Sequence, residues 1–113
     1  DFGFPIVVHP HDPDTVYVLP LEPATRTCPG GSPAVWCSEN GGSSWKKLAH
    51  GLPKKESFFT VQRDAMDIDE LSTPALYFGT TTGQLWMGRG AGEEWSCVFD
   101  ALPPIHCVEV ATV

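Results

Sequence analysis

Short apolar segments alternate along the chain with turns that are rich in Gly, Pro, Asn and Asp. None of them shows the 3.6-residue apolar period of an amphipathic helix, and most contain the aromatic and β-branched residues that favour strands. We therefore predict strands at 5–9, 15–19, 34–38, 44–48, 57–63, 75–79, 83–87 and 94–99, and the start of a further strand at 105–110.

The strand pattern occurs twice, and three pairs of anchor residues share a single shift of 50 positions. These pairs are Trp36 with Trp86, Trp45 with Trp95, and Pro53 with Pro103. A repeat of about four short strands per fifty residues is typical of β-propeller blades. We predict an all-β, partial β-propeller over 1–113, with four-stranded antiparallel blades at about 4–53 and 54–103. Residues 104–113 would form a closing strand or the first strand of a next blade.

A hairpin motif, Ser-Glu-Asn-Gly-Gly-Ser-Ser-Trp at 38–45, lies between the last two predicted strands of the first unit. Asn40 can hydrogen-bond the turn backbone, and Gly42 allows the positive φ of a tight hairpin. The hydroxyls of Ser38 and Ser44 can satisfy turn amides, and we expect Trp45 to bury its ring against the sheet. The corresponding stretch 88–95 keeps one glycine and the tryptophan, which predicts a glycine-rich hairpin without these side-chain hydrogen bonds.

The motif at 38–45 resembles the Asp-box of BNR-repeat, sialidase-like β-propellers, with Asn40 at the usual Asp position and Ser44 at the usual Thr position. Stretches 63–67 and 76–86 resemble the last full repeat of bacterial BNR-like proteins of largely unassigned function, and 9–18 resembles the start of a blade. The resemblance implies a carboxy-terminal part of a longer propeller, in which the box is a structural turn. Such propellers include sialidases, xyloglucan hydrolases, sorting receptors and photosystem assembly factors, so the resemblance implies a fold and no single activity.

Length and charge limit the possible partners. A propeller typically needs about 4 to 8 blades, so we expect self-association or the remaining blades of a longer chain. Three chains of two blades each would supply six. The net charge of −7 argues against nucleic acid and anionic membranes as partners. No apolar run has the length of a membrane span, and we expect a soluble protein, in the bacterial cytoplasm rather than secreted.

The residues suited to metal or redox chemistry lack the spacing for it. The four cysteines include no C-x-x-C pair, which favours free structural thiols over disulfides or metal ligands. His9 and His11 flank Pro10 in a predicted turn, where they do not share the strand face that a zinc site would use. We predict neither a metal nor a cofactor.

Arg63 and Asp64 form the pair that we favour for ligand binding, because loops that leave the first strand of a blade commonly line the mouth of the central channel. The acidic residues that follow, up to Glu70, are interpreted as a solvated loop. Arg26 and Arg89 lie in loops that do not suit a sialidase-like arginine trio with Arg63. The four tryptophans are predicted to belong to the core, and the catalytic residues, if any, are not identified.

These observations favour a non-catalytic segment of a BNR/Asp-box propeller that acts as a binding or assembly scaffold, with a carbohydrate or a protein as possible ligand. The alternative is part of a sialidase-like or other glycoside hydrolase. Its active site would be completed by missing blades or by other subunits.

Overall fold

The computed structural model describes residues 5–22, 27–54 and 59–111, in which short strands dominate. The strands form two four-stranded antiparallel sheets, each with its strands in chain order. The first sheet contains β1 (Ile6–Val8), β2 (Val16–Val18), β3 (Val35–Ser38) and β4 (Lys46–Leu48). The second contains β5 (Met66–Ile68), β6 (Leu76–Gly79), β7 (Leu85–Gly88) and β8 (Glu94–Phe99). The predicted all-β class with four-stranded antiparallel sheets is confirmed, whereas a propeller stays a prediction.

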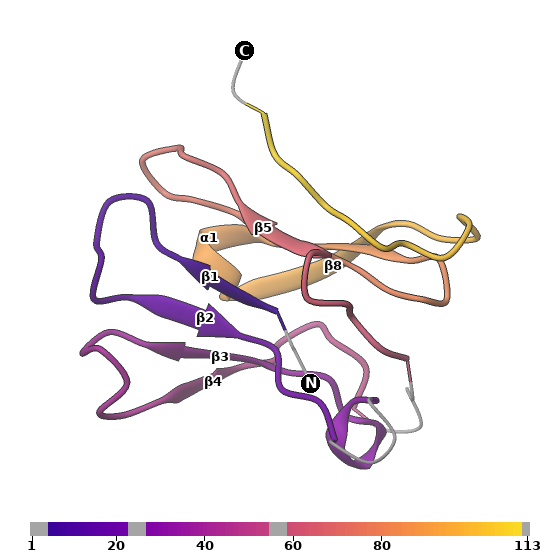
Figure 1. Ribbon diagram of the computed structural model, residues 1–113, viewed down its shortest axis with the longest axis horizontal. Coiled ribbons are helices and arrows are strands. Elements are labelled where there is room, and N and C mark those ends of the chain that lie inside the picture. The colour runs from indigo at the N-terminus through magenta and orange to yellow at the C-terminus, as the bar shows by residue number, and fades with distance from the viewer. Residues whose placement is uncertain (1–4, 23–26, 55–58, 112–113) are drawn as a thin grey trace.

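The two sheets stack against each other, with β1 beside β5 (Figure 1). Each sheet turns one face, its inner face, toward the other sheet, and these faces form one hydrophobic core. The first sheet contributes Tyr17, Val35, Cys37 and Leu48, and the second contributes Met66, Leu76, Phe78, Trp86 and Trp95. Phe78 lies at the centre of this core, with its ring centroid 5.2 Å from that of Trp95 and 6.4 Å from that of Trp86.

The structure reveals two different repeat shifts. The last two strands of each sheet keep the predicted shift of 50, since Trp36 corresponds to Trp86 and Trp45 to Trp95. The first two strands differ by 60, because β1 and β2 begin at residues 6 and 16 and β5 and β6 begin at 66 and 76. The stretch from the start of β2 to the start of β3, which includes the short 3-10 turn η1 (Pro29–Gly31), is therefore ten residues longer (60 − 50) than that from the start of β6 to the start of β7.

The predicted strand at 57–63 is wrong for the residues that the structure describes, 59–63, which are in no strand. Phe59 and Val61 are buried, but they pack on the core from a connecting segment. Its backbone is bonded to loops, with Phe59 O accepting from Cys28 N and Thr60 O accepting from Thr81 N. The first strand of the second sheet is β5 instead, whose pairing with β6 aligns Met66 with Phe78.

The acidic stretch after Arg63 is a second correction, because it contains β5 and is only partly a solvated loop. Asp69 is buried, and its Oδ1 accepts hydrogen bonds from the amides of Leu71 (3.2 Å) and Ala75 (3.1 Å). The Tyr77 hydroxyl donates to its other oxygen over 3.4 Å. Asp69 therefore shapes the turn between β5 and β6.

No strand forms at 105–110, where we expected one to begin. The segment nevertheless runs along the second sheet. Ile105 N donates to Thr80 O over 3.0 Å, and Val108 N donates to Asp64 O over 2.9 Å. The amide of Val110 is held by Asp67 Oδ2 at 2.7 Å. In the described part of the chain, no helix combines the length and apolar character needed to cross a bilayer.

The tryptophans divide between the core and the surface. Trp86 and Trp95 are buried as predicted and Trp36 is half-buried, but Trp45 is 43% exposed, so its predicted burial is wrong. Trp95 lies on the inner face of the second sheet and is covered by the first sheet. Trp45 occupies the same position on the first sheet, on the face that points away from the second.

Candidate functional site

The turn between β3 and β4 forms the side-chain hydrogen bonds that its sequence predicts. Asn40 Oδ1 accepts from the Ser44 amide (2.9 Å) and from the Ser38 hydroxyl (3.0 Å), while Asn40 Nδ2 donates to Ser44 Oγ (2.8 Å). The Gly42 amide donates to Ser38 Oγ over 2.8 Å, and φ of Gly42 is +99°. The turn is thus a closed network whose polar side chains are already engaged, which suits a structural role.

The corresponding connection in the second sheet is built from backbone conformation. It contains the short helical turn α1 (Arg89–Gly92), in which Gly90, Ala91 and Gly92 all have positive φ. An exposed ion pair of 3.4 Å joins Arg89 to Glu94 across the base of the loop. As predicted, the loop lacks the network of the first turn, and Arg89 is engaged locally rather than directed into a common arginine site.

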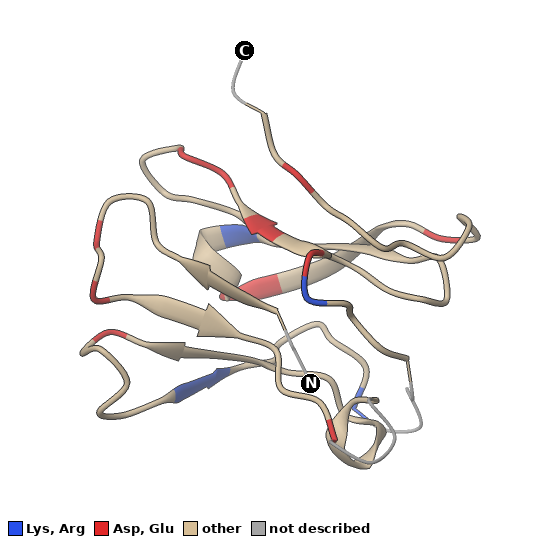
Figure 2. Cartoon of the chain, in the orientation of Figure 1, with Lys and Arg blue, Asp and Glu red and all other residues tan. Residues whose placement is uncertain are grey.

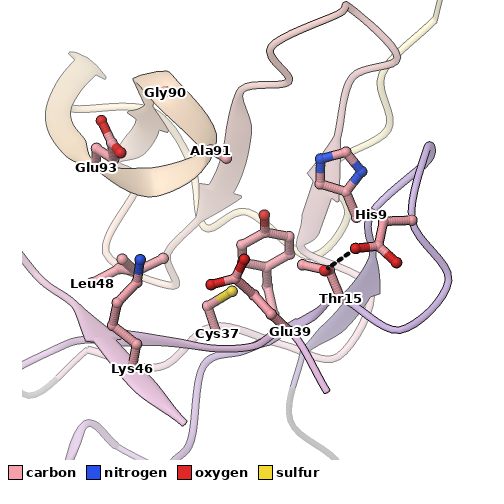
Figure 3. Close-up of a pocket in the computed structure, with 11 residues that line it drawn as sticks. His9, Thr15, Cys37, Glu39, Lys46, Leu48, Gly90, Ala91 and Glu93 are labelled. Carbon is pink, nitrogen blue, oxygen red and sulfur yellow. Dashed lines mark hydrogen bonds between the residues drawn. The ribbon is translucent and has the colours of Figure 1, made fainter. Parts of the chain in front are cut away.

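A polar cleft of about 260 Å³ lies between the first sheet and α1, beside the turn at 38–45 (Figure 3). Its floor is the inner-face pair Tyr17 and Cys37, which are register partners on β2 and β3. The rest of its lining comes from the β1–β2 turn, the ends of β3 and β4, and α1: His9, Asp12, Thr15, Glu39, Lys46, Leu48, Gly90, Ala91 and Glu93. Figure 3 shows Glu93 on the opposite wall from Lys46 and Cys37.

The groups in this cleft have electrostatics suited to binding and unsuited to nucleophilic attack. Burial, together with the neighbouring Cys37 and Glu39, raises the pKa of Tyr17 to about 12. Burial and Glu39 also raise the pKa of the Cys37 thiol, so both groups keep their protons near neutral pH. The pKa of Asp12 is lowered by the Thr15 hydroxyl, which donates to it over 2.7 Å, and by the Asp14 amide.

The cleft therefore offers both hydrogen-bond donors and acceptors. Asp12 presents a carboxylate, Lys46 presents an ammonium group and Tyr17 presents a protonated phenol. The ring centroids of Tyr17 and His9 are 6.4 Å apart. Its volume is below the roughly 300 to 1,000 Å³ of typical small-molecule pockets.

The pair that we favoured from sequence, Arg63 and Asp64, lies in a different and more open groove of about 390 Å³. The two residues precede β5 instead of following the first strand, in a turn closed by the Ala65 amide donating to Gln62 O. The rest of the groove lining comes from β1, β5 and the C-terminal segment: Ile6, Val7, Met66, Asp67, Cys107, Val108 and Glu109. Arg63 and Asp64 are exposed, and a ligand role for them stays a prediction.

Metal ligation finds no support in the part of the chain that the structure describes, where no three His, Cys, Asp or Glu side chains gather around a common point. His11 donates its amide to His9 Nδ1, and its own ring nitrogen Nε2 lies 3.1 Å from Glu70 O and 3.0 Å from Leu71 O. All four cysteines are free thiols, with Cys28 and Cys37 buried and Cys97 and Cys107 exposed. Cys107 is exposed because the segment 105–110 forms no paired strand. Arg26 lies outside the described residues.

Sequence reasoning missed the residues that line the cleft beside the turn. Glu39 lies inside the recognised motif, but its role was not visible because the motif's pattern leaves that position unspecified. Lys46 and Glu93 line the same cleft only because the two sheets stack, and no local spacing in the sequence indicates that they do. The Asp12-Pro13-Asp14-Thr15 turn was the one available signal, since Asp and Pro in this order predict a turn with a fixed carboxylate. No protein-family model matches this chain, and no curated protein shows significant similarity to it.

Proposed function

We propose that this chain is a non-catalytic segment of a BNR/Asp-box propeller and acts as a binding or assembly scaffold. One observation carries the proposal. The two sheets have corresponding residues at corresponding strand positions, and they stack one after the other in chain order, so that Trp95 of the second sheet lies against the first. Such stacking of repeated four-stranded sheets is how propellers are built. The engaged polar groups of the turn at 38–45 support a structural role for the motif.

The chemistry of the polar cleft and of the groove at Arg63 and Asp64 supports binding over catalysis. The two candidate nucleophiles in the cleft, Tyr17 and Cys37, are held in their protonated forms by burial. Glycoside hydrolysis needs two carboxyl groups placed on either side of a glycosidic bond. Asp64, one of the pair that we favoured for ligand binding, is exposed in an open groove, which does not exclude water as a closed active site does.

The proposal is tested by activity and binding measurements on the same protein. We expect no hydrolysis of fluorogenic sialosides or xyloglucan oligosaccharides above that of a chain carrying Asp64→Asn. We expect retention of selected glycans on an array, reduced by Lys46→Ala in the cleft and unchanged by Lys54→Ala outside it. Turnover that Asp64→Asn abolishes would overturn the proposal in favour of a glycoside hydrolase.

A further inference from the structure

We propose that the outer face of the first sheet is a docking surface for the second sheet of another copy of this chain. This face carries the strand positions that alternate with the inner ones: Ile6, Val8, Val16, Val18, Trp36 and Trp45. Ile6 and Val8 are 58% and 51% exposed, and Trp45 is 43% exposed. The inference rests on the proposed scaffold function and names its partner.

The contact between the two sheets inside the chain shows what such a face is shaped to meet. The residues of the second sheet that correspond to the exposed face are Met66, Ile68, Leu76, Phe78, Trp86 and Trp95, and they form its inner face. Trp95, which corresponds to Trp45, is 3% exposed, and its amide donates to His50 O over 2.8 Å. A face of this pattern is therefore covered, in this molecule, by the inner face of a neighbouring sheet.

The second sheet presents a matching surface on its outer side at β8, whereas the segment 105–110 covers that side beside β5. Leu85 pairs with Phe99 as Val35 pairs with Leu48, so Phe99 stands where Leu48 stands in the first sheet. Leu48 is buried at the contact between the sheets, whereas Phe99 is 55% exposed and the neighbouring Val98 is 44% exposed. Leu102 follows at 40%. The residues that would receive Trp45 of another copy are thus among those that the single chain leaves in water.

Charge favours the same pairing. Lys47 pairs with Trp36 and lies on the outer face of the first sheet. Asp100 directly follows Phe99 at the end of β8. Figure 2 shows the basic residues on β4 of the first sheet. Within the chain Trp95 of β8 meets His50, just after β4. The corresponding contact between copies places β4, with Lys47, beside the end of β8 and Asp100, and so brings opposite charges together.

One residue makes the contact between copies looser than the contact within the chain. Gly51 has φ of +95°, and a Cβ there would lie 2.1 Å from the Trp95 carbonyl oxygen. Ala101 occupies the position after β8 that corresponds to Gly51 after β4, and it also has positive φ (+62°). Its methyl group keeps the backbone of an incoming Trp45 from approaching as closely as Trp95 does. The association is then carried by side chains and is weak and concentration-dependent.

A head-to-tail contact joins two different faces, which allows a complementation test. The mass of the chain in solution is measured by light scattering up to about 500 µM, since mass action favours assembly at high concentration. We expect the mass to rise with concentration. Trp45→Lys disables one face and Phe99→Lys the other, so each variant alone should be a monomer, and an equimolar mixture should form a 1:1 dimer. Ala101→Gly should strengthen wild-type association several-fold.

The controls address folding and surface apolarity. Leu71→Lys replaces another exposed apolar residue, 64% exposed in the β5–β6 loop, and should leave association unchanged. Val8→Lys repeats the test of the first face if Trp45→Lys does not fold, as judged by circular dichroism. A wild-type monomer at every concentration would overturn the inference, as would a mixture of the two variants that stays monomeric. Either result would leave the glycan and turnover measurements, and hence the proposed function, unaffected.

Discussion

Trp45 and Trp95 occupy the same position in two sheets of the same topology, yet one is on the surface and the other is in the core. Each follows a glycine-containing turn and lies at the start of the last strand of its sheet or immediately before it. Trp95 lies over Gly88, where a Cβ would be 2.8 Å from its ring, and under the first sheet. Trp45 lies opposite Ser38 on an outer face. The environment of a repeated residue is therefore set by the neighbouring sheet, and its own turn does not decide it.

The largest loss of stability is expected when Trp95 is replaced by alanine, with Trp45→Ala as the comparison. Trp95→Ala removes a buried ring from the contact between the sheets and should lower the free energy of unfolding by about 3 to 5 kcal/mol. Trp45→Ala removes a partly exposed ring and should cost about 1 kcal/mol or less. Urea unfolding of dilute protein, followed by circular dichroism, measures both. Equal losses would contradict the difference in burial.

A smaller loss is expected from the close approach of Gly51 to Trp95. Gly51→Ala places a methyl group against the Trp95 carbonyl in a left-handed conformation, and should cost about 2 kcal/mol or more. Gly41→Ala is the matched control, because Gly41 also has positive φ (+68°) but a Cβ added there would meet no atom within 4 Å. That substitution should cost only about 1 kcal/mol. Thermal unfolding of the two variants separates crowding from backbone strain.

The two turns should respond differently to loss of a polar side chain. Asn40→Ala deletes three hydrogen bonds to Ser38 and Ser44 and should destabilise the chain by about 1 to 2 kcal/mol. Asn40→Asp keeps the two accepting interactions and should be close to wild type. Glu93→Ala, in the second loop, should change stability by about 0.5 kcal/mol or less. Chemical denaturation checks all three, and an Asn40→Ala variant as stable as Glu93→Ala would show that the network contributes little.

The smallest effect concerns the long β2–β3 connection, which carries Cys28 and has no counterpart of equal length in the second sheet. Burial raises the pKa of the Cys28 thiol from 9.0 to about 12. Between these pH values the unfolded chain loses the proton that the folded chain keeps, so stability is full below pH 9 and falls as the pH rises. The loss should reach about 1 kcal/mol at pH 10. Unfolding curves at pH 8 and pH 10 should show this loss, and Cys28→Ala should reduce it by that amount. A smaller slope remains, because burial also raises the pKa of Cys37 and Tyr17.

The sheets were predictable where strong local signals repeat. The aromatic anchors Trp36 and Trp86 and the polar turn at 38–45 marked strand pairs correctly, because their chemistry is read within a few residues. The position of β5 was not predictable in the same way. Met66-Asp67-Ile68 is short and lies in an acidic run, whereas Phe59 and Val61 mimic a strand by being apolar and alternating. Only the pairing of β5 with β6 identifies the true strand.

The candidate site depends on contacts that sequence reasoning could not supply. Tyr17 lies in a predicted strand, but Glu39 and Lys46 line the same cleft as Tyr17 only through the register of β3 and β4 and the approach of α1. Trp45 shows the same limit from the other side. Its type and position predicted burial, and the absence of a described sheet over it decided the outcome.

The chain order of strands within each sheet has a consequence for synthesis on the ribosome. Within each sheet, every strand after the first pairs with the one made immediately before it. The hydrogen-bond ladder of the first sheet is therefore complete once Leu48 has been made and has left the exit tunnel. Contacts between strands that are close in sequence form early in folding. The inner face of the first sheet, however, has to wait for Trp95, almost fifty residues later. During that interval the nascent chain exposes apolar side chains on both faces, which is when we expect chaperones to bind it.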